Sequence, residues 1–490
     1  MGSNGAPTVR PNVLVLFCDQ LRRDLLGCFG GTLVRTPHLD ALAHDSAIYD
    51  QYYTPTPICS PARASLMTGL YAHEHHMFNN SSPRYSYCRH LRPGVWILPD
   101  WIAEETDYES AYFGKWHIGP AEDLYNSSFE HTQRPDPSLP AALNNSHWHP
   151  NTSLGPLVKS VADGKAGTLD VPMEGFPDVV AARLSQNFLR TRDTSRPFAL
   201  FCSLPGPHQP WMVPEEFGIR YDPQDIPIWP NRYDGFEGKP NYQRKLRLLD
   251  DLKHSHAVGE ADLKELLACC FSYIELIDCM VGEVVATLRE LGLYDQTAIV
   301  FTADHGDMAK SHGFISKGAY PYQEIYHLPM LFKPPMPAGG QRVSVPANHM
   351  DVTATLLHLM SGEEQETMGP QQLHGKSLLP LLQGSNEWYK AVHYAEFHAD
   401  TYGHYSSRMV TDGRWKLAWN LGDLSEMYDL EDDPHEMTNL FYDRAYREVR
   451  DRYFATLLDE AQRYEDGQVE LFSSALEQQV ADLMGQPLPY

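Results

Sequence analysis

The chain has 490 residues and a formal net charge of −25, because 64 Asp and Glu side chains outnumber 39 Lys and Arg. This acidic balance argues against a nucleic-acid-binding protein, which usually carries a basic patch, and against a protein held on an anionic membrane surface. Hydrophobic residues make up 42% of the sequence and charged residues 21%, as in a globular enzyme and unlike a disordered chain.

No run of about 18 apolar residues occurs, so a transmembrane helix is not expected. Residues 1–7 lack the basic start and the apolar stretch of a secretory signal. We therefore expect a cytoplasmic protein, or a secreted or periplasmic one if a signal was removed before this sequence begins. The sequence predicts no particular oligomeric state.

Three short apolar runs predict strands that are buried on both faces of a parallel sheet, at residues 12–17, 197–201 and 297–301. Apolar residues at three- and four-residue steps predict a long helix over residues 261–291, which Gly292 would end. Strands that alternate with helices indicate an α/β fold with a large, mixed, mostly parallel sheet flanked by helices.

The segment 120–260 is rich in Pro, Asn, Asp and Trp, and we interpret it as long excursions over the sheet. Near the C-terminus, residues 408–419 predict a hairpin that turns at Asp412-Gly413, and a helix is expected near residues 442–462. We therefore expect a catalytic domain over residues 1–375. A smaller α+β subdomain over residues 376–490 would carry a small antiparallel sheet and a helix.

Polar residues follow each of the three predicted strands. In α/β sheets, functional sites form at the carboxyl ends of the strands. We therefore expect one shared site to contain Asp19, Gln20, His208, Asp304 and His305.

Residues 57–69 predict a helix whose start carries chemistry. Ser60 suits the N-cap, Pro61 the first helical position and Gly69 the exit. Cys59 would then stand just before the helix, where free amides and the helix dipole favour an anion. Arg63, about one turn later, would point back at the same spot. This arrangement suits a nucleophile that becomes anionic or attacks an anion.

The stretch from Cys59 to Arg63 matches the C-x-P-x-R signature of type I sulfatases, the formylglycine-dependent enzymes of the alkaline phosphatase superfamily. Gly114-Lys115-Trp116-His117 resembles the Gly-Lys-Trp-His segment of that family. Residues 302–318 and 324–329 resemble its second metal-binding block, and residues 427–436 resemble its usual ending. The resemblance spans nearly the whole chain.

The resemblance implies that a formylglycine-generating maturation enzyme oxidises Cys59 to formylglycine, which is hydrated to a gem-diol. One hydroxyl attacks sulfur in line and the alcohol leaves. The second hydroxyl then loses its proton, sulfate is expelled and the aldehyde returns. The implied substrate is an anionic sulfate ester, and a sulfated carbohydrate is one candidate class.

The resemblance also implies one divalent metal ion, which neutralises the ester and lowers the pKa of the nucleophile. Oxygen-rich ligands favour Ca²⁺, with Mg²⁺ and Mn²⁺ as alternatives. By position, the implied ligands are Asp19, Gln20, the modified Cys59, Asp304 and His305.

Other residues receive roles from the same resemblance. Lys115 and Lys317 would bind the sulfate oxygens, and Arg63 would hold the diol. His117 would take the proton from the second hydroxyl, and His208 would protonate the leaving oxygen, alone or with Lys317. Asn80 is a further candidate for a substrate contact. His312 and Glu324 receive no role.

Two departures from the arylsulfatase pattern leave alternatives open. Many arylsulfatases carry a second Asp and an Asn at the places held here by Gln20 and His305. Asp-Gln and Asp-His pairs also resemble phosphonate monoester hydrolases and phosphodiesterases, which use the same formylglycine. Lys115 and His117 favour a sulfatase. A third alternative is a non-catalytic binding protein in which Cys59 stays a thiol. Four tryptophans would line a sugar pocket or belong to the core: Trp101, Trp148, Trp211 and Trp388.

Overall fold

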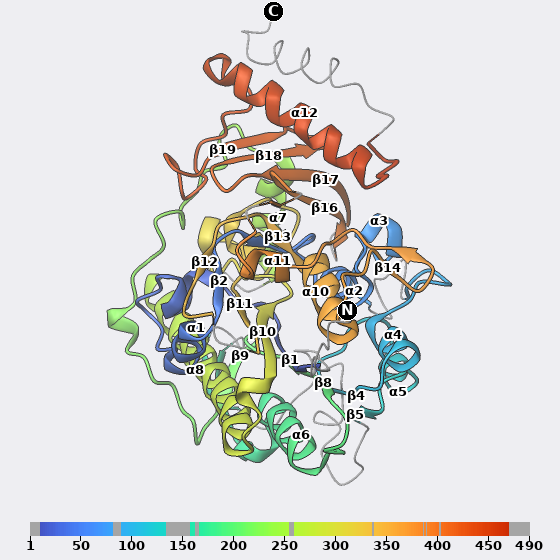
Figure 1. The fold of residues 1–490 in the computed structure, drawn as a ribbon. Helices are drawn as coiled ribbons and strands as arrows, with labels where there is room; N and C mark the ends of the chain where they lie inside the picture. The colour runs from blue at the N-terminus through green and yellow to red at the C-terminus, as the bar shows by residue number, and fades with distance from the viewer. Residues whose placement is uncertain are drawn as a thin grey trace, which may run out of the picture.

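The computed structural model describes residues 10–81, 90–133, 157–161, 166–253, 259–335, 338–385, 387–388, 390–400 and 403–469. Its centre is an eight-stranded sheet in the order β12-β2-β11-β10-β1-β8-β4-β5 (Figure 1). The strands are β1 (Asn12–Cys18), β2 (Ala47–Tyr49), β4 (Glu109–Gly114), β5 (His131–Thr132), β8 (Phe198–Leu204), β10 (Thr297–Ala303), β11 (Met330–Lys333) and β12 (Arg342–Val343). β1, β4, β5, β8 and β10 are parallel, and β11 runs antiparallel to both its neighbours. The predicted mixed, mostly parallel sheet is confirmed.

Helices cover both faces of this sheet. The apolar run of β1 alternates between them: Leu14 and Leu16 pack with one set of helices, and Val13 and Val15 with the other. The first set is α1 (Pro37–His44), α6 (Pro177–Thr191) and α8 (Glu260–Glu290), and the second is α2 (Cys59–Thr68), α4 (Leu98–Glu105) and α10 (His349–Ser361). A strand that is covered on both faces needs an unbroken apolar sequence, which is why the three runs predicted β1, β8 and β10 correctly.

Shorter elements surround this body. The helices are α3 (Ala72–His75), α5 (Ala121–Tyr125), α7 (Asn241–Lys253), α9 (Gln323–Tyr326) and α11 (Leu379–Leu382). The small sheets pair β3 (Tyr52–Tyr53) with β13 (Ala347–Asn348), β14 (Thr367–Met368) with β15 (Gln371–Gln372), and β7 (Ala166–Leu169) with both β6 (Leu157–Val161) and β9 (Trp211–Pro214). Segment 120–260 thus contributes β8 and α6 to the main body as well as the small sheet of β6, β7 and β9, whose strands β7 and β9 are buried. No helix in the described part of the chain is both long and apolar enough to cross a bilayer.

A four-stranded antiparallel sheet and one helix form the C-terminal part, at the red end of the ribbon in Figure 1. They are β16 (His393–Asp400), β17 (Gly403–Thr411), β18 (Trp415–Asn420), β19 (Glu426–Asp429) and α12 (Arg447–Arg463). The predicted hairpin is confirmed, and Gly413 turns it with a φ of +95°. The predicted helix starts later than expected, because Arg444–Tyr446 form a 3-10 turn capped by Asp443. The domain boundary at residue 375 stays a prediction.

A buried ion-pair network ties α3 to β16. His73 Nδ1 lies 2.9 Å from Glu396 Oε2, and the backbone N–H of His73 donates to Oε1 of the same carboxylate at 3.0 Å. The second ring nitrogen lies 2.8 Å from the carbonyl oxygen of Tyr464, so both ring nitrogens face acceptors. Burial lowers the pKa of His73, but the charge and hydrogen bond of Glu396 outweigh it and raise the pKa to about 9. Asp466 lies in the same cluster, where Arg408 pairs with it, so two basic and two acidic groups meet here.

Replacing His73 with asparagine is expected to cost stability in a pH-dependent way. Because the folded pKa of about 9 exceeds the ordinary 6.5, this histidine stabilises the fold fully below pH 6.5, and its contribution disappears as the pH rises through 9. A shift of this size corresponds to roughly 3 kcal/mol. Urea unfolding of both proteins between pH 6 and 9.5 should show the difference in unfolding free energy shrinking. The exposed His44→Asn is the control, and a pH-independent difference would contradict the pairing.

Candidate active site

The ends of four parallel strands lie level and bring the predicted polar residues together. Cys18 of β1 is in register with Ala303 of β10 and with Leu204 of β8, and Gly114 of β4 pairs with Ser203. The residues that follow these strands therefore meet at one edge. They are Asp19 and Gln20 after β1, Lys115 after β4, His208 after β8, and Asp304 and His305 after β10.

The helix α2 begins two residues earlier than the sequence suggested. Its N-cap is Ile58, so Cys59 is the first helical residue, and the prediction that Ser60 caps the helix is wrong. The backbone N–H of Ser60 instead donates to Asn80 Oδ1 at 3.0 Å. This cap comes from a separate loop, which a local sequence pattern does not reveal. Gly69 ends the helix in the left-handed region, as predicted.

Four buried side chains form a possible metal-binding cluster. Asp19, Cys59, Asp304 and His305 each place one potential ligand atom within 4.8 Å of the others. Cys59 Sγ lies 3.1 Å from His305 Nε2 and 3.6 Å from Asp19 Oδ1. His305 Nδ1 lies 2.8 Å from the carbonyl oxygen of Gly306, which only accepts, so Nδ1 carries a hydrogen and Nε2 is the nitrogen that would bind a metal ion once it is deprotonated.

The charges around this cluster suit a cation. Burial and the neighbouring Asp19 raise the pKa of Asp304 to about 6, because two carboxylates are enclosed side by side. Burial opposes ionisation of Cys59, but Lys115, Lys317 and His305 lower the pKa of its thiol well below the ordinary value. Two carboxylates, an imidazole and an anionic group at position 59, whose sulfur stands where a formylglycine oxygen would lie, match the ligands of a divalent ion.

Arg63 contacts residues from three strand ends of the site. Its Nε donates to Asp304 Oδ2 at 2.8 Å, and its Nη1 donates to the carbonyl oxygen of Lys115 at 2.8 Å and to Ser203 Oγ at 2.9 Å. Nη2 has no hydrogen-bond partner among the described residues. The guanidinium therefore positions Asp304 and Lys115, a contact set that the sequence did not predict.

Two lysine side chains contact residues of the site. Lys115 Nζ contacts the carboxylate of Asp19. Lys317 Nζ lies 2.7 Å from Gln20 Oε1 and 2.9 Å from His208 Nε2, and His208 Nδ1 lies 2.6 Å from the carbonyl oxygen of Gln209. Because that carbonyl only accepts, His208 carries its hydrogen on Nδ1 and accepts from Lys317 through Nε2.

The pKa directions support this assignment. Burial and Lys317 lower the pKa of His208. Burial alone lowers the pKa of Lys317, but Cys59 and Asp19 outweigh it and raise the pKa. Lys317 is therefore the protonated partner of the pair. His117, on the loop after β4, has a φ of +60° and is among the groups that lower the pKa of the Cys59 thiol.

His312 and Glu324, which received no role from the sequence, contact residues of nearby loops. His312 pairs with Asp234 at 2.6 Å and stacks on Tyr322 with 3.7 Å between ring centroids. Glu324 accepts from Asn231 Nδ2 at 2.8 Å. Of the tryptophans, Trp101 and Trp211 are core residues, Trp388 is half-buried and Trp148 lies outside the described residues.

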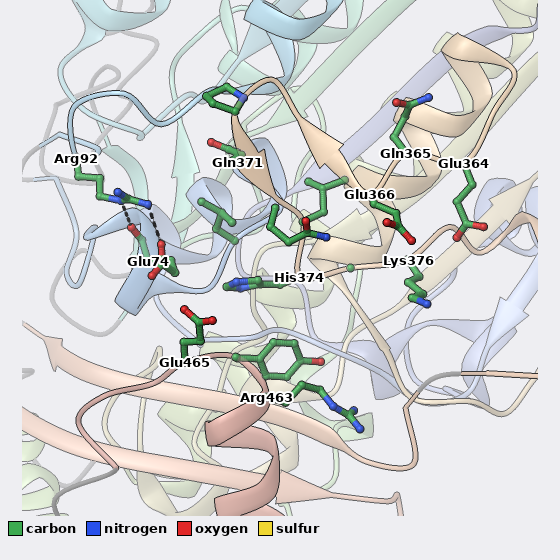
Figure 2. Close-up of a pocket in the computed structure, with 16 residues that line it drawn as sticks. Glu74, Arg92, Glu364, Gln365, Glu366, Gln371, His374, Lys376, Arg463 and Glu465 are labelled. Carbon is green, nitrogen blue, oxygen red and sulfur yellow. Dashed lines mark hydrogen bonds and ion pairs between the residues drawn. The ribbon is translucent and has the colours of Figure 1, made fainter.

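A separate pocket of about 530 Å³ lies between α3, the loop around His374 and the end of α12 (Figure 2). Arg92 and Glu74, which pair at 2.7 Å, form one wall, and Arg463 and Glu465 lie near another. None of the predicted site residues lines it. This pocket is therefore distinct from the candidate active site.

Two residues of the site were missed by sequence reasoning. Ser203 is an inward-facing residue near the end of β8, and only its contact with Arg63 reveals it. Asp307 stood inside the motif after β10, and its buried carboxylate accepts from the amide of Gln20. An acidic residue three positions after Asp304 was the available signal.

Comparisons with known proteins agree with this geometry. The Sulfatase family model matches residues 11–363, and the model for the C-terminal part of N-sulphoglucosamine sulphohydrolase matches residues 310–463. The uncharacterized sulfatase YidJ of Escherichia coli K12 is 26% identical over 472 residues, covering 93% of this chain and 88% of the relative. An N-acetylglucosamine-6-O-sulfatase of Bacteroides thetaiotaomicron is 25% identical over 530 residues, covering 94% of this chain and 88% of that protein.

The fold also matches solved structures. Phosphonate monoester hydrolase of Agrobacterium radiobacter superposes with a TM-score of 0.77 at 24% identity, over 93% of this chain and 96% of that one. This likeness shows a shared fold alone. Because the Sulfatase family model covers well over half of the sequence, the chain belongs to the sulfatase family and is a sulfuric-ester hydrolase.

Proposed function

We propose that this protein cleaves a sulfate monoester with Cys59 converted to formylglycine by a maturation enzyme, and with one Ca²⁺ held by Asp19, Gln20, Asp304, His305 and position 59. The observation that carries the proposal is the buried cluster of donor atoms within 4.8 Å of one another. Lys115 contacts Asp19 of this cluster and Lys317 contacts the adjacent Gln20, so positive charge is available to an anionic ester there.

Formylglycine would supply a gem-diol, which is a stronger nucleophile toward sulfate than a serine or cysteine side chain. A divalent ion bound by the cluster would neutralise the ester oxygens and lower the pKa of the nucleophile. Lys115 and Lys317 would bind the sulfate oxygens. Arg63 would keep Asp304 and the backbone of Lys115 in place around them.

His117 is among the groups that lower the pKa of the Cys59 thiol, and it is the proposed acceptor of the proton from the second hydroxyl at position 59. The Lys317–His208 pair would protonate the leaving oxygen. Lys317 carries the proton, and His208 accepts a hydrogen bond from it. We therefore propose that Lys317 donates its proton to the leaving oxygen and that the Lys317–His208 pair takes up a proton again afterwards. Asn80 caps α2 beside the nucleophile through its Oδ1, so a substrate contact by Asn80 would come from its NH₂ group.

Substituting His208 with alanine is expected to slow esters with poor leaving groups more than esters with good ones, because only a basic alkoxide needs a proton as it leaves. We expect a loss of about 10² to 10³ in kcat for an alkyl or sugar sulfate, against roughly tenfold for 4-nitrophenyl sulfate. Steady-state kinetics on both substrates measure this difference. The exposed His44→Ala is the control, and equal losses on both substrates would contradict proton donation.

The sulfated substrate is proposed to be a sugar, since one relative is an N-acetylglucosamine-6-O-sulfatase. The main alternative is a phosphonate monoester, because Gln20 and His305 resemble the residues of that branch and a hydrolase of this kind shares the fold. Turnover of 4-nitrophenyl sulfate, glucosamine 6-sulfate and the ester 4-nitrophenyl phenylphosphonate by the purified protein separates the alternatives. A strong preference for the phosphonate would overturn the sulfatase proposal.

Mass analysis of the peptide that contains Cys59 tests the nucleophile independently. An active preparation should show the aldehyde in place of the thiol. A fully active preparation that contains only cysteine would refute the formylglycine assignment.

We propose that the protein is modified and works in the cytoplasm. Cell fractionation with an antibody would test the compartment.

A further inference from the structure

The carboxylate of Asp307 is buried beneath the candidate site and uses both of its oxygens. Oδ1 accepts from two backbone N–H groups, that of Ala309 at 2.6 Å and that of Ser316 at 3.2 Å. Oδ2 accepts from Nε2 of Gln20 and lies 3.5 Å from Nε2 of Gln209. Every group that faces this carboxylate in these contacts is therefore a hydrogen-bond donor.

This arrangement decides which way the amide of Gln20 points. A carboxylate only accepts, so the NH₂ group of Gln20 must face Asp307 and the oxygen must face the other way. That oxygen, Oε1, lies 2.7 Å from Lys317 Nζ and 3.3 Å from Ser316 Oγ. A reversed amide would place two N–H donors against the ammonium of Lys317.

The backbone also holds Gln20 in place. Gln20 has a φ of +64°, in the left-handed region that costs a residue other than glycine about 1 kcal/mol or more. Its N–H donates to Asp304 Oδ1 at 3.0 Å, so this conformation connects the loop after β1 to the loop after β10. Both the backbone and the side chain of Gln20 are thus constrained by acidic residues of the second loop.

We propose that Asp307 is a positioning residue: it orients the carboxamide of Gln20 so that the amide oxygen holds Lys317 against His208 on the leaving-group side of the site. Asp307 itself touches neither Lys317 nor His208 in the described contacts and acts through Gln20. This inference rests on the proposed function, because the roles of Lys317 and His208 come from it.

The substitution Asp307→Asn tests the inference by changing one acceptor into a donor. The two backbone N–H groups will keep the oxygen of the new amide, so its NH₂ group turns toward Gln20. Gln20 must then rotate its own oxygen to that side and present its NH₂ group to Lys317. We expect kcat/KM for a sulfate ester with a poor leaving group to fall about 30-fold, and for 4-nitrophenyl sulfate less.

A second substitution restores the pattern in a way that a purely structural role would not. In the double variant D307N/Q20E, the carboxylate at position 20 accepts from the new amide on one side and from Lys317 on the other. We expect its kcat/KM to return to within about fivefold of wild type. The single variant Q20E places two carboxylates face to face and should be impaired like D307N. The exposed Asp295→Asn serves as a matched control that should change nothing.

Melting temperatures of the metal-free proteins provide a readout that does not depend on activity. Each single variant should melt about 2 °C or more below wild type, and the double variant should recover most of this loss. A D307N enzyme with wild-type kinetics, or a double variant no better than either single one, would overturn the inference. If the wild-type protein hydrolyses no sulfate ester, the proposed function fails, whereas the melting-temperature cycle still decides the orientation of Gln20.

Discussion

Replacing Cys59 with alanine is expected to lower the turnover of a sulfate ester by a factor of at least about 10³, with little change in the fold. The side chain is fully buried at the start of α2, and its neighbours are the acidic, basic and imidazole groups of the site and not a well-packed apolar core. Truncation to alanine removes one sulfur atom and leaves the helix cap from Asn80 intact. Initial rates and circular dichroism of the variant measure the two effects.

Cys202 offers a matched control for this experiment. It is also fully buried, in the neighbouring strand β8, but it belongs to the apolar cluster with α6 and α8, and burial raises the pKa of its thiol to about 12. Cys202→Ala should therefore keep its activity and lose stability, by about 1 kcal/mol or more, through the cavity it leaves. Full turnover by Cys59→Ala would remove Cys59 from the reaction.

Asp304→Asn is expected to abolish metal binding and activity together. Asp304 contributes one of the two carboxylates of the cluster, and the amide keeps its shape while removing the charge. Metal affinity should fall at least about 100-fold and kcat/KM at least about 10³-fold. Metal analysis of the dialysed protein and calcium titration of its activity measure both.

The control for Asp304 is Asp178→Asn. Asp178 is equally buried, accepts from the N–H of Gly206 at 2.8 Å and from the hydroxyl of Tyr273 at 2.8 Å, and lies outside the cluster of donor atoms. Burial raises its pKa to about 6, as it does for Asp304, so both substitutions remove a carboxylate of comparable environment. Undiminished metal content in Asp304→Asn would remove Asp304 from the metal site.

The parts of the fold that the sequence predicted are those that depend on local pattern. The buried runs that became β1, β8 and β10 had to be continuously apolar, because helices cover the sheet on both faces. The long helix α8 showed its apolar repeat directly, and the turn at Asp412-Gly413 needed a residue that accepts a positive φ. The boundaries were less certain, since the start of α12 depended on a 3-10 turn.

The meeting of Asp19, Gln20, His208, Asp304 and His305 followed from the sequence by one general rule, that parallel strands end at the same edge of a sheet. The sequence motifs added Cys59, Arg63, Lys115, His117 and Lys317 through their family resemblance. These arguments place residues in one region, but they do not orient side chains. Orientation depends on contacts between segments that are far apart along the chain.

Three features of the site were decided only by the tertiary structure. Asn80 caps α2 from another loop. Arg63 donates a hydrogen bond to Asp304. Asp307 selects the direction of the Gln20 amide. Local preferences differ by tenths of a kcal/mol, whereas leaving a buried polar group without a partner costs about 1–3 kcal/mol. Composition and motif therefore determined the fold class and the chemistry of this protein. The pairing of buried charges determined how each group is aimed.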